Sequence, residues 1–317
     1  MKCLILAAGY ATRLYPLTEN QPKPLLTVGN KTILDWLIDD IDGAGLVDEY
    51  IVISNHKFAR HFQDWANTKP QKITIVDDGT STNETRLGAV CDIQFAIEQL
   101  NLDDDMLVIA GDNLLDFSLQ RFVHYAHKKQ TSCIMRFWET DEQRLLKCGV
   151  VTIDEQDRIL RMTEKSPTPE THWCCPPFYY YTRQDARLVK KGIENGCGTD
   201  APGSYIAWLC TQTPVHAMEM PGKRYDIGNL QSYEQVQHNF ECLKKQAETI
   251  FGFEYDEDFF TNKKIIEEII SGFESANSFK VISSRKKAIY EAIKIAQKND
   301  IVLLVGKGAE AYNIDKN

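Results

Sequence analysis

Hydrophobic and polar residues follow two alternating patterns over residues 1–130. Short apolar runs have the length of β-strands, and between them apolar residues recur three and four positions apart, as on one face of a helix. The runs lie at 3–7, 50–54, 73–76 and 106–110. This succession predicts an α/β domain whose strands are mostly parallel. The first run is short and leads directly into Arg13, so we interpret it as a buried strand and not as a signal peptide.

Local signals predict two of the helices. Thr32 and Asp35 have the spacing of a capping box, and Gly43 favours a helix end shortly afterwards. A second helix is expected over 85–100, because apolar residues of that segment fall near one face. These residues are Leu87, Val90, Ile93, Ile97 and Leu100.

The pattern changes from residue 132 onward. Runs at 133–138, 149–153 and 158–163 predict strands, and the polar segment 154–157 predicts a hairpin turn between the last two. An aromatic strand is expected at 178–181 and further helices up to 194 and over 205–210. The whole predicts a Rossmann-like α/β fold with a mixed, mostly parallel sheet flanked by helices.

The composition shifts towards Lys, Glu and Ile after about residue 237. We therefore predict two units, a domain over 1–240 and a small C-terminal α/β unit over 245–317. Within the second unit, 265–273 and 285–297 have helical patterns and 301–305 has that of a strand.

The overall charge narrows the classes of partner. The 317 residues include 36 Lys and Arg against 45 Asp and Glu, which gives a formal net charge of -9. This balance argues against binding to nucleic acid or to anionic membrane surfaces, although a local basic pocket remains able to hold a phosphate. No apolar run reaches the roughly 18 residues of a transmembrane helix. Nine cysteines without C-x-x-C spacing indicate free thiols and a cytoplasmic location.

The segment after the first strand has the chemistry of a phosphate-binding loop. It reads LAAGYATRLYPLT from Leu6 and is followed by PKPLL from Pro22. Gly9 allows the main chain to approach a phosphate closely, so that backbone N–H groups can point at it. Arg13 and Lys23 would neutralise phosphate charge. Each feature taken singly also fits an ordinary solvated turn.

The combined string resembles the sugar-phosphate nucleotidyltransferase family, also called nucleotide-sugar pyrophosphorylases. The family's opening pattern is L-A-A-G-x-G-T-R-L-x-P-L-T, followed by P-K-P-L. One position departs from it, since Ala11 replaces the second glycine, and alanine tolerates a positive φ poorly. The resemblance implies the fold of nucleotide-diphospho-sugar transferases and catalytic roles for Arg13 and Lys23. It also implies nucleotide binding by Ala8, Gly9, Thr12, Asn83 and Gly88.

Two carboxylates are candidate metal ligands. Asp112 directly follows the buried strand at 106–110, where α/β sheets bind ligands, although an aspartate there also fits a turn cap. The segment RYDIG, with Asp226, resembles the family's second metal-binding segment. The resemblance implies that Asp112 and Asp226 together bind Mg²⁺, which prefers oxygen ligands.

A third segment, MTEKS at 162–166, resembles the family's F-x-E-K-P, with serine in place of proline. The resemblance implies that Glu164 holds the acceptor's hydroxyl groups, Lys165 its phosphate, and Gly149 contributes backbone contacts. Without the resemblance, Glu164 and Lys165 also fit an exposed pair at a strand end.

The implied activity is a magnesium-dependent transfer that converts a nucleoside triphosphate and a sugar 1-phosphate into a nucleotide-diphospho-sugar and pyrophosphate. A phosphate monoester, with its second pKa near ~6, is largely dianionic at neutral pH and attacks without a general base. Two alternatives remain open: a cytidylyltransferase for a non-sugar phosphate such as phosphocholine, and a non-catalytic nucleotide-binding docking module in cell-wall synthesis. The base, the acceptor and a homo-oligomeric state are also left open.

The C-terminal segment 283–310 resembles the end of the Mur ligases, which add an amino acid to UDP-N-acetylmuramoyl peptides. Their typical close is D-R-x-x-A-I, then D-x-V-L-x-A-G-K-G-H-E, and here Ala309 replaces the histidine. The chain has no G-x-x-x-x-G-K-[ST] loop, so this segment alone is not expected to support ATP-dependent ligation. We expect a structural or docking role.

Overall fold

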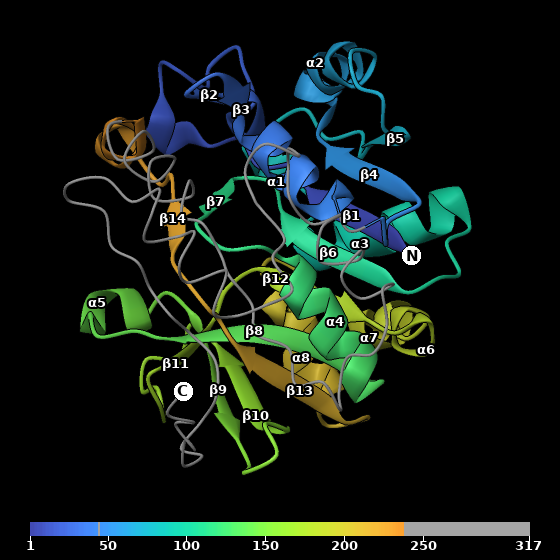
Figure 1. The fold of residues 1–317 in the computed structure, drawn as a ribbon, viewed down its shortest axis with the longest axis vertical. Coiled ribbons are helices and arrows are strands. Elements are labelled where there is room, and N and C mark those ends of the chain that lie inside the picture. Colours follow the sequence, from blue (N-terminus) through green and yellow to red (C-terminus); the bar gives the residue numbers. More distant parts are fainter. Residues whose placement is uncertain (44, 238–317) are drawn as a thin grey trace, which may run out of the picture. The chain divides into compact units, whose positions relative to one another are not determined.

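The computed structural model describes residues 1–43 and 45–237, and the predicted unit over 245–317 lies outside them. A mixed ten-stranded sheet forms the centre of this part (Figure 1). Its strands are β1 (Lys2–Leu6), β4 (Glu49–Ser54), β5 (Ile73–Asp77), β6 (Met106–Ala110), β8 (Ser132–Trp138), β9 (Gly149–Ile153), β10 (Ile159–Glu164), β11 (Trp173–Cys175), β12 (Phe178–Tyr181) and β13 (Val215–Glu219). Their order is β10-β9-β11-β8-β12-β6-β1-β4-β5, with β13 paired to β8.

One half of the sheet is parallel. Strand β1 lies between β4 and β6 and runs parallel to both, and β5 continues the parallel half beyond β4. Leu4 and Ile5 are both 0% exposed on opposite faces of β1, as expected for a strand with helices on both sides. The prediction of a buried first strand is therefore confirmed.

Helices cover both faces. On the face of Ile5 the core is completed by α1 (Ile33–Asp42), α2 (His56–Ala66) and α4 (Gln120–Lys129). On the face of Leu4 it is completed by α3 (Ala89–Leu100), α7 (Val189–Glu194) and α8 (Gly203–Leu209). The short helices α5 (Glu142–Leu145) and α6 (Arg183–Ala186) connect strands of the other half. The predicted Rossmann-like fold class is confirmed.

The other half contains the antiparallel strands. Strand β12 is antiparallel to both β6 and β8 and joins the two halves. Strands β9 and β10 form the predicted antiparallel hairpin, and β11 pairs with β9 on its other side. Two small ladders lie apart from the main sheet: β2 (Thr27–Val28) with β3 (Lys31–Thr32), and β7 (Asn113–Leu115) with β14 (Arg224–Asp226).

The two helix predictions have different outcomes. The capping box of α1 is present, since the Asp35 N–H donates to Thr32 Oγ1 at 3.1 Å and the Thr32 N–H donates to Asp35 Oδ2 at 3.0 Å. The helix expected over 85–100 begins only at Ala89, because Gly88 has a φ of 92° and ends the preceding irregular segment. Leu87 is consequently 37% exposed and does not join the buried face.

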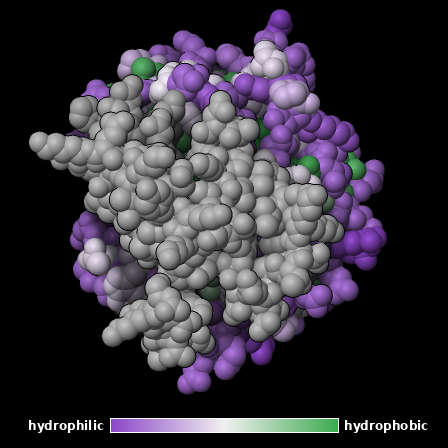
Figure 2. Space-filling view, viewed as in Figure 1, coloured by the Kyte–Doolittle hydropathy of each residue, from purple (hydrophilic) through white to green (hydrophobic). Residues whose placement is uncertain are grey.

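The surface and the cysteines fit the expectations from composition. On the face of the molecule that Figure 2 shows, the coloured atoms belong mostly to hydrophilic residues. The eight cysteines in the described part of the chain are all free thiols. No helix within 1–43 and 45–237 is long and apolar enough to cross a membrane.

Candidate active site

The loop after β1 presents unused backbone donors. Within the described chain, the N–H groups of residues 8–13 donate no hydrogen bond. Two side chains outside residues 8–13 hold the loop in position. Asn55 Nδ2 donates to the Ala8 carbonyl at 2.9 Å, and Thr18 Oγ1 donates to the Ala11 carbonyl at 2.8 Å. A run of free N–H groups in such a turn forms an anion-binding concavity.

Ala11 adopts the conformation that favours glycine. Its φ and ψ are 47° and 40°, in the left-handed region, and its carbonyl also accepts the Leu14 N–H at 2.9 Å. For alanine this conformation costs roughly 1–2 kcal/mol. The hydrogen bonds from Leu14 and Thr18 hold the turn in this conformation.

Three charged side chains from distant segments meet beside this loop. Lys23 lies in a 3₁₀ turn, is 7% exposed, and places Nζ 2.7 Å from Asp112 Oδ2. The same ammonium is 3.7 Å from Asp226 Oδ1. Asp226 reaches this position because it ends β14 and pairs with Asn113, the residue after Asp112. The structure therefore brings together Lys23, which is predicted to be catalytic, and both metal-ligand candidates.

The electrostatics favour an ionised Asp112. Burial by itself would raise the pKa of Asp112, but the Lys23 ammonium and smaller contributions together hold that pKa below its usual value. Arg224, the first residue of β14, acts in the same direction. Asp112 is thus available as a carboxylate for a cation.

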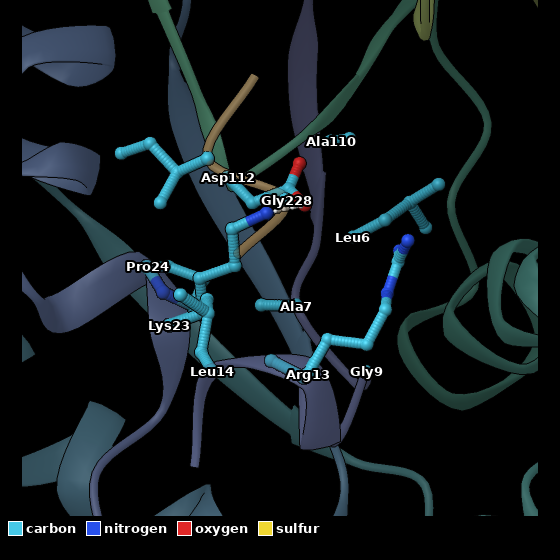
Figure 3. A pocket seen from close by; sticks show the side chains of 12 residues that line it. Leu6, Ala7, Gly9, Arg13, Leu14, Lys23, Pro24, Ala110, Asp112 and Gly228 are labelled. Atoms are coloured by element: carbon cyan, nitrogen blue, oxygen red, sulfur yellow. Dashed lines mark hydrogen bonds and ion pairs between the residues drawn. The ribbon is translucent and has the colours of Figure 1, made fainter. Parts of the chain in front are cut away.

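Lys23 and Asp112 line a cavity of about 260 Å³. Figure 3 shows the Lys23 side chain reaching Asp112 across it and the Arg13 side chain entering from the loop. Arg13 forms no ion pair with any residue that the structure describes, so its guanidinium is available to an anion. Typical ligand pockets have ~300–1,000 Å³, so this cavity suits the phosphate part of a larger ligand. Its lining consists of Leu6, Ala7, Gly9, Ala11, Arg13, Leu14, Lys23, Pro24, Ala110, Asp112, Ile227 and Gly228.

The predicted acceptor residues form a second group. Glu164 ends β10 and pairs with Gly149 at the start of β9, where a Cβ on Gly149 would lie 2.7 Å from Glu164 Oε1. A glycine at position 149 therefore allows the Glu164 carboxyl group to occupy its observed position. The next residue, Lys165, has a φ of 49° and donates its N–H to the Cys148 carbonyl at 3.0 Å. Burial raises the pKa of Glu164, Lys165 opposes this, and Asp200 adds to it.

The predicted base-recognition segment is shaped by a contact that the sequence pattern did not reveal. A Cβ on Gly88 would lie 2.6 Å from the Thr199 carbonyl oxygen, so glycine is required for the close approach as well as for its positive φ. Asn83 lies in a 3₁₀ turn and accepts a hydrogen bond from Arg86 at its side-chain oxygen, at 3.3 Å. Arg86 in turn bonds to Asp200. The only signal for Thr199 and Asp200 was a polar, glycine-bearing break in the pattern.

Both groups lie on one edge of the sheet. The parallel strands β1 and β6 end there, and the Ala110 N–H at the end of β6 donates to the Pro177 carbonyl at 3.1 Å. Two residues earlier, Cys175 pairs with Gly149 at the start of β9. The carboxyl ends of parallel strands are where α/β sheets bind ligands, and here that edge continues into the predicted acceptor residues.

Comparison with known proteins finds a matching family model and related chains. Residues 2–242 match the family model described as Nucleotidyl transferase. The bifunctional protein GlmU of Methanocaldococcus jannaschii is 26% identical over 230 residues, 72% of this chain and 51% of that protein. The GlmU of Methanococcus aeolicus is 33% identical over 256 residues, 80% of this chain and 57% of that protein. The chain thus spans about half the length of these curated relatives.

A solved structure shares the fold. The crystal structure of a UDP-glucose pyrophosphorylase complexed with UDP-glucose has a TM-score of 0.65 and 20% identity, and the match covers 76% of this chain and 98% of that one. The resemblance to the end of the Mur ligases, which the sequence suggests for residues 283–310, lies outside the described residues.

Proposed function

Because the chain belongs to the nucleotidyl transferase family, we propose that it transfers a nucleotidyl group from a nucleoside triphosphate to a sugar 1-phosphate and releases pyrophosphate. One observation carries the proposal. Lys23 Nζ lies 2.7 Å from Asp112 and 3.7 Å from Asp226, beside a loop whose N–H groups have no acceptor within the described residues. Such a site offers positive groups for phosphates and carboxylates for a cation.

The triphosphate binds in this proposal along the loop after β1. The free N–H groups of residues 8–13 and the Arg13 guanidinium face its oxygens, and Arg13 stabilises the charge that develops on the leaving pyrophosphate. Lys23 stays near the phosphates, where its ammonium reduces the repulsion between the two anionic substrates.

Asp112 and Asp226 fit a magnesium ion. Mg²⁺ commonly takes one or two carboxylates and completes its shell with phosphate oxygens and water, and these two carboxylates converge on one ammonium. No group of three or more His, Cys, Asp or Glu side chains in the described part of the chain is placed to hold a metal ion by itself. When bound, the ion would offset charge at the reacting phosphate.

The acceptor lies in this proposal at Gly149, Glu164 and Lys165. Glu164 accepts hydrogen bonds from sugar hydroxyl groups, and Lys165 holds the attacking phosphate. A phosphate dianion is already a nucleophile, so alignment and charge compensation suffice and no general base is required.

The test is a matrix of ATP, GTP, CTP, UTP and dTTP against sugar 1-phosphates and phosphocholine, with pyrophosphate as the readout. We expect release with at least one sugar 1-phosphate and a loss of ~10²-fold or more in Asp112→Asn, judged from the transition-state stabilisation that such charged groups supply. Asp64→Asn, a change on the exposed side of α2, is the matched control. Release with phosphocholine alone would indicate the non-sugar transferase. Tight nucleotide binding with no release from any pair would indicate a docking module.

A further inference from the structure

The side chain of Asp200 bridges two cations that come from separate parts of the chain. Its Oδ1 lies 2.9 Å from Arg86 Nη2, and its Oδ2 lies 3.5 Å from Lys165 Nζ. Arg86 precedes α3, Lys165 follows β10, and Asp200 lies between α7 and α8. One carboxylate therefore holds together the base-recognition segment and the predicted acceptor lysine.

The main chain around this bridge is firmly placed. The Val90 N–H donates to the Thr199 carbonyl at 3.0 Å, and the Ala89 N–H donates to the Asp200 carbonyl at 3.3 Å. The contact between Gly88 and Thr199 adds a steric constraint. Because backbone bonds fix the segment, the Asp200 side chain can turn away without displacing α3.

The three side chains of the bridge remain accessible. Arg86 is 46% exposed, Asp200 60% and Lys165 54%. These three side chains carry two positive charges and one negative charge, and the Glu164 carboxyl group also acts on Lys165 and Asp200. A phosphate monoester carries up to two negative charges and three acceptor oxygens, and a guanidinium can bind it through two parallel hydrogen bonds. Such an anion is a better partner for Arg86 and Lys165 together than the single carboxylate.

We propose that Arg86 is a second binding residue for the acceptor's phosphate, and that Asp200 is an internal anion which that phosphate displaces. The proposal rests on the proposed function, because it assigns the phosphate bound at Lys165 to the attacking substrate. The exchange aligns Arg86 and Lys165 on one phosphate and turns the Asp200 carboxylate towards solvent.

Arg86 also connects this exchange to the nucleotide side. Its Nη1 donates to the Asn83 carbonyl at 3.2 Å and to the Asn83 side-chain oxygen at 3.3 Å. Movement of the guanidinium towards a phosphate changes these bonds. Binding of the acceptor therefore affects the segment that is expected to contact the base.

The test measures binding and needs no turnover. Methyl phosphate, a phosphate monoester without a sugar, is titrated into the full-length protein by calorimetry at fixed pH and salt. In Arg86→Gln we expect the affinity to fall about 10-fold, as for the loss of a charge-assisted hydrogen bond. In Asp200→Asn we expect it to rise several-fold, because the competing anion is gone, and Arg86→Lys should keep part of the affinity.

Arg187→Gln is the matched control, since Arg187 is an exposed arginine that bonds to the Asp103 carboxylate at 2.7 and 2.8 Å. Its affinity for methyl phosphate should equal that of the wild type. The opposite signs expected for Arg86→Gln and Asp200→Asn exclude a general loss of folding as the cause.

Unchanged affinity in Arg86→Gln, or an equal fall in both variants, would overturn the proposal. Absence of methyl phosphate binding to the wild-type protein would also overturn it. The proposed function is tested separately by pyrophosphate release. If the Arg86→Gln variant releases pyrophosphate at the wild-type rate, only this inference is refuted. If the protein binds methyl phosphate as described but never releases pyrophosphate, only the proposed function is refuted.

Discussion

Replacement of Asp92 by asparagine should stabilise the protein in a strongly pH-dependent way. Asp92 lies in the first turn of α3, is 6% exposed, and its Oδ1 has no hydrogen-bond partner among the described residues. Burial, and secondarily the nearby Asp78 carboxyl, raise the pKa of Asp92 from 3.8 to about 7. The pKa of Asp78 is also raised, chiefly by burial, although Thr80 donates two hydrogen bonds of 2.7 Å to it.

The magnitude follows from linkage between protonation and folding. Because the native pKa of Asp92 is the higher one, the folded protein retains this proton more tightly than the unfolded chain. The resulting stability is complete below the unfolded pKa of about 4 and is lost as pH rises through about 7. A difference of about 3 pKa units corresponds to ~4 kcal/mol of stability. Of this contribution, ~2–3 kcal/mol are lost as the pH rises from about 5 to about 8.

Asparagine imitates the neutral carboxyl group and cannot ionise. Urea unfolding of the wild type and Asp92→Asn at both pH values isolates the effect, because titrating groups other than Asp78, which interacts with Asp92, cancel in the difference. The gain from Asp92→Asn should be ~2–3 kcal/mol larger at about pH 8 than at about pH 5, with Asp64→Asn as the exposed control. An equal difference at the two pH values would refute the assignment of a raised pKa to Asp92.

Further substitutions test the site itself. Ala11→Gly should stabilise the protein by about 1 kcal/mol in urea unfolding, since it removes the strain of the left-handed conformation at some cost in backbone entropy. A loss of stability would contradict the observed φ. Gly149→Ala should raise the KM for the acceptor about 10-fold or more and leave triphosphate affinity unchanged, because its Cβ would displace Glu164. A change confined to triphosphate affinity would assign Gly149 to the other substrate. Lys23→Met should lower pyrophosphate release by ~10²-fold or more and raise the pKa of Asp112, measured by NMR titration.

Local patterns and the family resemblance together predict which residues belong to the candidate site. The apolar runs at 3–7 and 106–110 predict strands, and strands of a parallel sheet end at one edge. The pattern alone is therefore consistent with the loop of Arg13 lying near Asp112, as the structure has it. The turn at Ala11 was in doubt because alanine disfavours it, and the bond from Thr18 that helps hold it depends on the folded chain.

Contacts between distant segments account for what was missed. The start of α3 at Ala89 depends on Thr199 and Asp200, whose carbonyls accept the first helical N–H groups. The bridge from Arg86 to Asp200 joins residues that no periodic pattern relates. The position of Asp226 likewise depends on β14, a strand of three residues whose pairing with β7 is set by the rest of the fold.

The reversed direction of β12 bears on how such a protein diverges. This strand is antiparallel to both of its neighbours. It separates the parallel strands, which carry Asp112 and the loop proposed to bind the triphosphate, from the β9–β10 hairpin, which carries Gly149 and Glu164. Mutations in the hairpin can accumulate without altering the register of β1 and β6. Under the proposed function, we expect that a hairpin grafted from a relative changes the acceptor preference and leaves the register of the strands that carry Asp112 unchanged.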